Sequence, residues 1–143
     1  MKRFASLLIA LILAPTLALA SPVGLWSRTG PNGETKIEIE QDGVNYTGTI
    51  AWMENPRNDT NNPDPALQDR PLVGVQLFND MTQINENRWE GSLYNPEDGN
   101  TYEGSVTVLG PDTLELEGCV TIIIFPICQS DTWTRTTLSV SHN

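Results

Sequence analysis

Histidine is almost missing from this sequence of 143 residues. The one histidine, His142, belongs to a Ser-His-Asn tail at the end of the chain, where most domains are poorly ordered. A zinc site therefore lacks ligands, and a Ser-His-Asp or Cys-His nucleophile cannot form within a folded core. We expect no metal, no cofactor and no enzymatic activity, unless two carboxylates face inward within one cavity.

Basic residues are also scarce. Lys and Arg number 8 against 18 Asp and Glu, which gives a formal net charge of −10. A chain this acidic has no electrostatic footprint for nucleic acid and would be repelled by anionic lipid. The acidic residues between Asp59 and Asp69 do not follow the spacing of a calcium-binding loop. We interpret the acidity as a source of solubility.

Long apolar runs are few. One of them, Leu7 to Leu13, follows the basic residues Lys2 and Arg3. Ala18-Leu19-Ala20 then supplies the small-x-small pattern of a signal-peptidase site. We predict a signal peptide over 1–20 and a single β-barrel domain over 21–143, periplasmic or secreted. The alternative is an N-terminal membrane anchor, although the run is shorter than the ~20 residues that a spanning helix needs. Cleavage would leave no transmembrane segment and a charge of −12, because two basic residues are removed.

Cysteine occurs twice, at Cys119 and Cys128. The spacing rules out a Cys-x-x-Cys redox pair, and in an oxidising compartment it predicts a disulfide. Closing so short a loop stabilises the fold by about 2.5–3 kcal/mol in the chain-entropy account.

The region after residue 20 consists of short alternating apolar and polar runs between turn residues, which is typical of an all-β protein. In 36–40 the isoleucines alternate with glutamates, so the glutamates face solvent and offer no buried acid–base pair. The same alternation recurs along 113–117. We predict eight strands, at about 23–29, 35–40, 44–53, 72–78, 87–94, 101–109, 113–122 and 130–137.

Three of these strands repeat an aromatic, a glycine and an aliphatic residue on one face: Tyr46-x-Gly48-x-Ile50, Trp89-x-Gly91-x-Leu93 and Tyr102-x-Gly104-x-Val106. Glycine within a strand marks a sharp bend or a close approach. Several on inward faces predict a small closed antiparallel barrel rather than a flat sandwich.

The longest interruption between strands is 54–71. Asp64 suits a helix N-cap and Pro65 suits the first helical position, so a short helix is expected within 64–69. Loops of this length are often functional lids. A connector that plugs one end of the barrel is an equally good interpretation.

Four ordered motifs together resemble the exported bacterial family called domain of unknown function 2147 (DUF2147). The resemblance covers the whole predicted mature chain and implies a calycin-like, lipocalin-like barrel, without an established activity. Its motifs are Gly24-Leu25-Trp26, the segment 61–72, the segment 93–102, and the closing segment with Gly118-Cys119, Cys128-Gln129 and 132–135.

The wider calycin pattern pairs a tryptophan of the first strand with an arginine of the last. The resemblance places these roles on Trp26 and Arg135, as a fold signature and not as catalytic groups. A guanidinium over an indole face stabilises by about 0.5–2 kcal/mol.

An eight-stranded barrel has an interior that side chains fill or that holds one small ligand. A ligand-binding interior would be lined by Tyr46, Trp52, Trp89 and Tyr102, with Phe125 from the hairpin tip. The alternative is a packed core in which each ring fills the space over a neighbouring glycine. The expected function is binding of a small apolar or amphipathic ligand by an exported protein.

The residues between the two cysteines, 120–127, are apolar except for Thr121. If exposed, this disulfide-bounded tip would be a surface for a protein partner, a membrane or ligand entry. If folded over the mouth of the barrel, it would be core. An envelope interaction module acting through 120–127 is therefore the alternative function.

Overall fold

A computed structural model describes residues 12–13 and 20–138. Most of the predicted signal peptide lies outside the described residues. His142 also lies outside them. Within the described part of the chain, no helix is long and apolar enough to cross a membrane.

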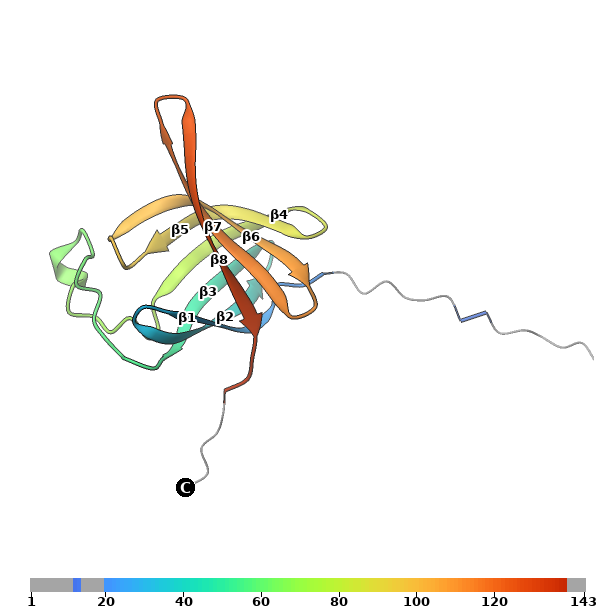
Figure 1. The fold of residues 1–143 in the computed structure, drawn as a ribbon, viewed down its shortest axis with the longest axis horizontal. Helices are drawn as coiled ribbons and strands as arrows, with labels where there is room; N and C mark the ends of the chain where they lie inside the picture. The colour runs from blue at the N-terminus through green and yellow to red at the C-terminus, as the bar shows by residue number, and fades with distance from the viewer. Residues whose placement is uncertain (1–11, 14–19, 139–143) are drawn as a thin grey trace, which may run out of the picture.

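Eight antiparallel strands form a closed barrel in which each strand pairs with the next along the chain and β8 returns to β1 (Figure 1). The prediction of a small closed β-barrel is confirmed. The strands are β1 (Gly24–Gly30), β2 (Gly33–Asp42), β3 (Asn45–Met53), β4 (Gln76–Asn85), β5 (Arg88–Asn95), β6 (Asn100–Gly110), β7 (Thr113–Ile122) and β8 (Phe125–Arg135).

Two strands differ clearly from their predicted ranges. The prediction of 72–78 was wrong for β4, because Gly74 has φ +98° and interrupts the extended backbone before Gln76. The strand then runs to Asn85 through mainly polar, exposed residues that the apolar pattern did not reveal. The prediction of 130–137 was wrong for β8, which begins at Phe125 because the ladder with β7 continues to a two-residue turn.

In one half of the barrel interior, side chains fill the space over strand glycines. The Phe78 ring occupies the space where Gly48 would carry a Cβ, and Met81 and Leu93 do the same at Gly104. The predicted packing of a ring over a strand glycine therefore occurs at Gly48, whereas aliphatic side chains cover Gly104 and Asp80 lies beside Gly91. The buried apolar residues of the whole barrel are Trp26, Ile37, Ile39, Ile50, Met53, Leu72, Val75, Leu77, Phe78, Met81, Trp89, Leu93, Val106, Val108, Leu114, Leu116 and Trp133.

Arg135 closes the barrel where the last strand meets the first. Its guanidinium carbon lies 4.2 Å from the Trp26 ring centroid, as the family resemblance implied. The same guanidinium donates to the carbonyls of Val23 (2.8 Å) and Pro111 (2.9 Å). A Cβ on Gly24 would lie 2.4 Å from this group, so glycine is required there.

Trp52 lies on the outside of the barrel. The expectation that it shares the inward face of Ile50 was wrong, because the β2–β3 register shifts beside Ile37 and opposes Ile37 to Ile50 but Lys36 to Trp52. This irregularity reverses the alternation, so that Met53 is buried and Trp52 is exposed. The Lys36 ammonium lies 5.0 Å from the Trp52 ring centroid.

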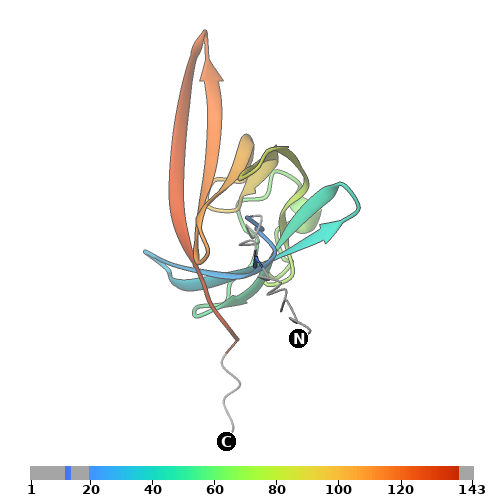
Figure 2. The same ribbon diagram turned by 90° about the vertical axis from the view of Figure 1, so that its right-hand side faces the viewer.

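The β7–β8 hairpin rises well beyond the other strands (Figures 1 and 2). Pairing of β7 with β6 ends where Glu103 opposes Cys119, whereas β7 and β8 stay paired to Ile122 and Phe125. The expected disulfide joins Cys119 to Cys128 at the base of this projection, with the Cα atoms 4.1 Å apart. The tip therefore does not fold over the barrel mouth.

The segment between β3 and β4 folds back on itself. Asn58 and Pro71 form an isolated antiparallel bridge. The expected helix is one 3₁₀ turn, η1 (Pro65–Leu67), and the Asp64 side chain caps it by accepting from Ala66 N at 3.0 Å.

Candidate functional site: a cup at the open end of the barrel

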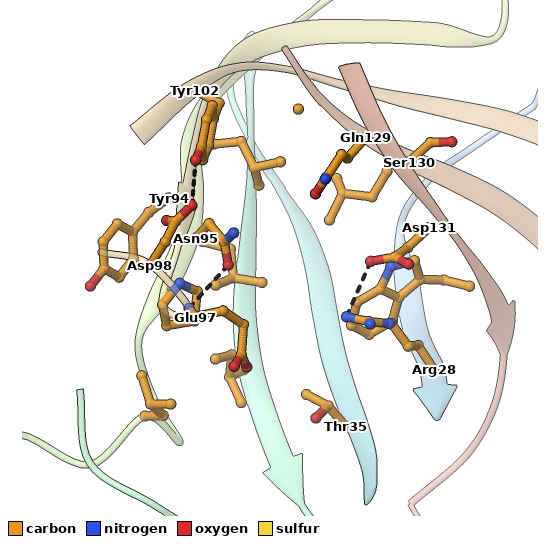
Figure 3. Close-up of a pocket in the computed structure, with 18 of the residues that line it drawn as sticks. Arg28, Thr35, Tyr94, Asn95, Glu97, Asp98, Tyr102, Gln129, Ser130 and Asp131 are labelled. Carbon is orange, nitrogen blue, oxygen red and sulfur yellow. Dashed lines mark hydrogen bonds and ion pairs between the residues drawn. The ribbon is translucent and has the colours of Figure 1, made fainter. Parts of the chain in front are cut away.

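The barrel interior opens at one end into a cavity of about 760 Å³. We call this cavity the cup. Its apolar lining comes mainly from strands on several sides of the barrel, and its polar lining comes from the loop and turn residues and from strands that include β1 and β8 (Figure 3). The apolar residues are Ile50, Met53, Leu72, Leu77, Leu93, Pro96, Leu116, Val120, Ile127 and Trp133.

One wall of the cup lies at the seam between β1 and β8. These strands pair only at Trp26–Arg135 and Ser27–Thr134, so side chains bridge the rest of the seam. Arg28 donates to Asp131 at 3.1 Å and lies over the Trp133 ring at 6.0 Å. The buried Trp133 indole N–H has no hydrogen-bond partner among the described residues.

The opposite wall carries the β5–β6 turn, with Tyr102 and Asp98 facing the cup (Figure 3). The Tyr102 hydroxyl donates to the Asp98 carboxylate. Burial acts to raise the pKa of Asp98, but this hydrogen bond and backbone donors outweigh it and lower the pKa below its ordinary value. The same hydrogen bond raises the pKa of Tyr102.

A buried carboxylate holds the long loop against this wall. Asp59 is fully buried, and it accepts hydrogen bonds from Tyr94 Oη (2.6 Å), Asn62 Nδ2 (2.8 Å) and Arg70 Nε (2.9 Å). Burial acts to raise the pKa of Asp59, but these donors and the Arg70 charge hold it below the ordinary value. Burial and the neighbouring carboxylate raise the pKa of Tyr94 to about 12.

The loop also contributes directly to the cup. Arg57 lies in its lining and forms an ion pair with Glu97 of the β5–β6 turn. Asn61 donates to the carbonyls of Pro96 (3.2 Å) and Glu97 (2.9 Å) in the same turn. The segment is therefore tied into the wall of the cup at several points.

The five predicted ligand residues are not brought together. Tyr102 lines the cup, whereas Trp89 is buried in the packed half with its ring centroid 5.5 Å from that of the half-buried Tyr46. Trp52 faces outward, and Phe125 is exposed on the hairpin tip.

The chain matches, over residues 24–135, the profile of a family described as "Uncharacterized protein conserved in bacteria (DUF2147)". The chain belongs to this family. Among solved structures, this DUF2147 chain is similar to protein HP1028 from the human pathogen Helicobacter pylori, described as belonging to the lipocalin family. The TM-score is 0.70, with 20% identity and 86% of each chain covered. At that identity the likeness shows a lipocalin-like fold alone, and no curated protein matches.

The disulfide and the bacterial family together fit a periplasmic or extracellular location for the DUF2147 chain.

The sequence analysis did not identify the polar residues that line the DUF2147 cup. Their spacing from buried residues on the same strands could have indicated them. Arg28 follows the buried Trp26 at a spacing of two, and Asp131 precedes the buried Trp133 at the same spacing. Thr35 precedes the buried Ile37, also by two residues. All three polar residues line the cup, so inward positions that change from apolar to polar along a strand indicate its open end.

In the lining of the DUF2147 cup, the acidic side chains of Glu97, Asp98 and Asp131 are each engaged by a neighbouring donor. The lowered pKa of Asp98 opposes the protonated role that acid catalysis needs. In the described residues, the cluster with metal-ligand spacing contains Glu117, Cys119 and Cys128, and its two cysteines are joined in the disulfide.

Proposed function

We propose that this DUF2147 protein binds a small amphipathic molecule in the cup. The observation that carries the proposal is an open cavity of about 760 Å³ that is lined by apolar side chains from several strands and by polar side chains on two facing walls. That volume lies within the range of roughly 300–1,000 Å³ of small-molecule sites, which are mainly apolar with a few polar groups that orient the ligand.

The seam wall supports an orientation for the ligand. Arg28 is partly exposed in this wall, lies over the Trp133 ring and pairs with Asp131. Hydrogen bonds from a charged donor are stronger than those from a neutral one, so an oxygen acceptor beside this guanidinium would be stabilising. The ligand would therefore direct an oxygen-bearing end to the seam and its apolar body to Leu93 and Leu116.

Gly118 offers a way to fill the cup without disturbing its frame. A Cβ there would meet Leu93 Cδ2 and the Tyr102 Cβ at 3.5 Å, which is ordinary contact. We expect Gly118→Ile to occupy the cup and to abolish binding, while the protein stays folded. Gly110→Ile is the matched control, because a Cβ there meets nothing within 4 Å.

The measurement is native mass spectrometry of protein purified from its own host, followed by extraction of any bound molecule. The expected result is a small amphipathic molecule on the wild-type protein and on Gly110→Ile, and none on Gly118→Ile. Equal occupancy of all three proteins would place the molecule elsewhere. Absence from every protein, together with no uptake of an environment-sensitive apolar dye, would reject the cup as a binding site.

A second role is favoured by the exposure of 120–127. We propose that this tip is a docking surface of the exported protein. Its most exposed members are Ile123 (89%), Ile124 (76%) and Phe125 (67%). Apolar side chains this accessible add nothing to the core, so contact with another surface accounts for them best.

A further inference from the structure

The hairpin tip combines apolar exposure with a complete lack of charge. From Gly118 to Ser130 the chain has no charged side chain, although the whole protein carries −10. Along the chain, the charged residues that flank this stretch are Glu117 and Asp131, at the base of the projection. The exposed large apolar residues of this tip are Val120, Ile122, Ile123, Ile124, Phe125 and Ile127.

The hairpin turn contains a residue type that is unfavourable for its backbone conformation. Ile123 has φ +60°, and it is the one non-glycine residue with positive φ among the described residues. A β-branched side chain is strained in this conformation, and two-residue hairpin turns favour Gly, Asn or Asp there. Strain of this kind clusters at functional sites such as active sites, ligand clamps and switch regions. The choice of two adjacent isoleucines, Ile123 and Ile124, therefore points to an apolar contact.

The shape of the tip does not suit a second copy of the chain. A stable protein interface takes roughly 20–30 residues from each side, whereas the tip has eight and is convex (Figure 2). Pro126 lacks the N–H that an added strand would need, which protects the free edge of β8. Two copies of so acidic a chain also repel one another.

We infer that the tip docks on the surface of a phospholipid bilayer with zwitterionic headgroups. The inference rests on the proposed role of the tip as a docking surface and adds the identity of its partner. A fluid bilayer closes around a convex apolar projection, whatever its outline. An uncharged tip enters such a surface without needing basic residues, which are the usual means of binding anionic lipid.

The length of the projection sets the depth of insertion. The four residues from Cys119 to Ile122 rise about 13 Å at ~3.3 Å per residue. Interfacial apolar elements lie about 5–10 Å into the boundary between headgroups and acyl chains. Glu117 and Asp131 would then remain in water and limit further entry, since charged groups are expelled from the apolar layer.

Docking would join the cup to the bilayer. Val120 and Ile127 are opposed across β7 and β8, and both line the cup, as do Gly118 and Gln129 below them. Ile122 and Phe125 continue the same face to the tip, because side chains alternate along a strand. From Val120 and Ile127 to the tip this face is apolar, and an amphipathic molecule would pass along it between lipid and cup.

The test uses the full-length mature chain and sucrose-loaded vesicles of phosphatidylcholine, with sedimentation as the measurement. The variant is Ile123→Gly with Ile124→Asn, which removes both isoleucines and relaxes the left-handed position, so its melting temperature should not fall. Val44→Asn is the matched control, because Val44 is 78% exposed and belongs to a different turn. We expect the wild type and Val44→Asn to sediment with vesicles, and the tip variant to bind about a hundredfold more weakly.

The charge of the vesicles and the state of association complete the test. Replacing a third of the phosphatidylcholine with phosphatidylglycerol should weaken binding at low salt, because the protein is acidic. Vesicle binding that the tip variant retains would overturn the inference. Failure of the wild type to bind vesicles would also overturn it; if light scattering then shows oligomers that the variant lacks, the docking role survives with a second copy as partner.

Discussion

At the scale of a single residue, Asp59 fixes the long loop in the wall of the cup. A carboxylate removed from water is destabilising unless donors surround it. Here Tyr94 supplies a donor from β5, and Asn62 and Arg70 supply donors from two points within the loop. The loop is thereby fixed to the strand beside the cup.

We expect Asp59→Asn to lower the free energy of unfolding by about 2–3 kcal/mol at pH 7, because Arg70 loses its buried anionic partner. The pKa of Asp59 is lowered in the fold from the ordinary 3.8. Its contribution is therefore present above about pH 4 and is lost as the pH falls through the lower, folded-state pKa. Urea unfolding at pH 7 and at decreasing pH below 4 measures both effects.

The control for this substitution is Asp69→Asn, in the same loop but exposed. It should change stability by less than about 0.5 kcal/mol. A difference between wild type and Asp59→Asn that stays constant below pH 4 would contradict the proposed ionic role of Asp59.

At the scale of the element, the β1–β8 seam is the weakest junction of the barrel. Its two residue pairs contrast with the ten that join β7 to β8. Arg135 compensates by binding the Trp26 ring and three carbonyls, those of Ser21, Val23 and Pro111. One side chain thus ties the first strand, the last strand and the β6–β7 turn together.

We expect Trp26→Leu and Arg135→Ala each to destabilise the barrel, and the double variant to show a coupling of about 0.5–2 kcal/mol. Chemical denaturation of the four proteins measures the cycle. Trp26→Leu combined with Arg88→Ala should be additive within ~0.5 kcal/mol, because Arg88 lies on β5. If the changes in the free energy of unfolding caused by Trp26→Leu and Arg135→Ala simply add, their contact does not stabilise the barrel.

The same seam explains why a cup exists at all. Where backbone pairing between β1 and β8 stops, Arg28, Asp131 and Trp133 take over as side-chain contacts and leave the end of the barrel open. β7 and β8 extend beyond their neighbouring strands. The apolar face that is buried within the barrel is therefore exposed at the hairpin tip.

At the scale of the whole molecule, the barrel has a packed half and an open half. Sequence reasoning treated a solid core and a ligand cavity as alternatives, whereas the structure contains both. Gly48 and Gly104 admit rings and aliphatic side chains at the packed end, whereas Gly118 faces the cup. The packed half of the barrel thus supports the open cup.

Cellular location belongs to the same scale, because the disulfide fits an oxidising compartment. We expect the mature chain to begin at Ser21, as predicted from Ala18-Leu19-Ala20. Intact-mass measurement of periplasmic or secreted protein should give the mass of 21–143 with one disulfide. A full-length mass would favour the membrane-anchor alternative.

The amino-acid sequence by itself determined the class of the fold, the disulfide and most strands, because each depends on local signals. Alternation of apolar and polar residues sets which face is buried, and turn residues set where strands end. Cys119 and Cys128 could be paired from spacing and compartment. The contact of Arg135 with Trp26 followed from a family pattern.

Only the tertiary structure decided where the alternation breaks and which apolar residues stay exposed. The irregular register beside Ile37 turned Trp52 outward, and no local signal marks it. Ile122 and Phe125 satisfy the strand pattern as well as any core pair does, yet the neighbouring strands stop before reaching them. Burial depends on whether another element arrives to cover a face, and that is a property of the assembled barrel rather than of any one strand.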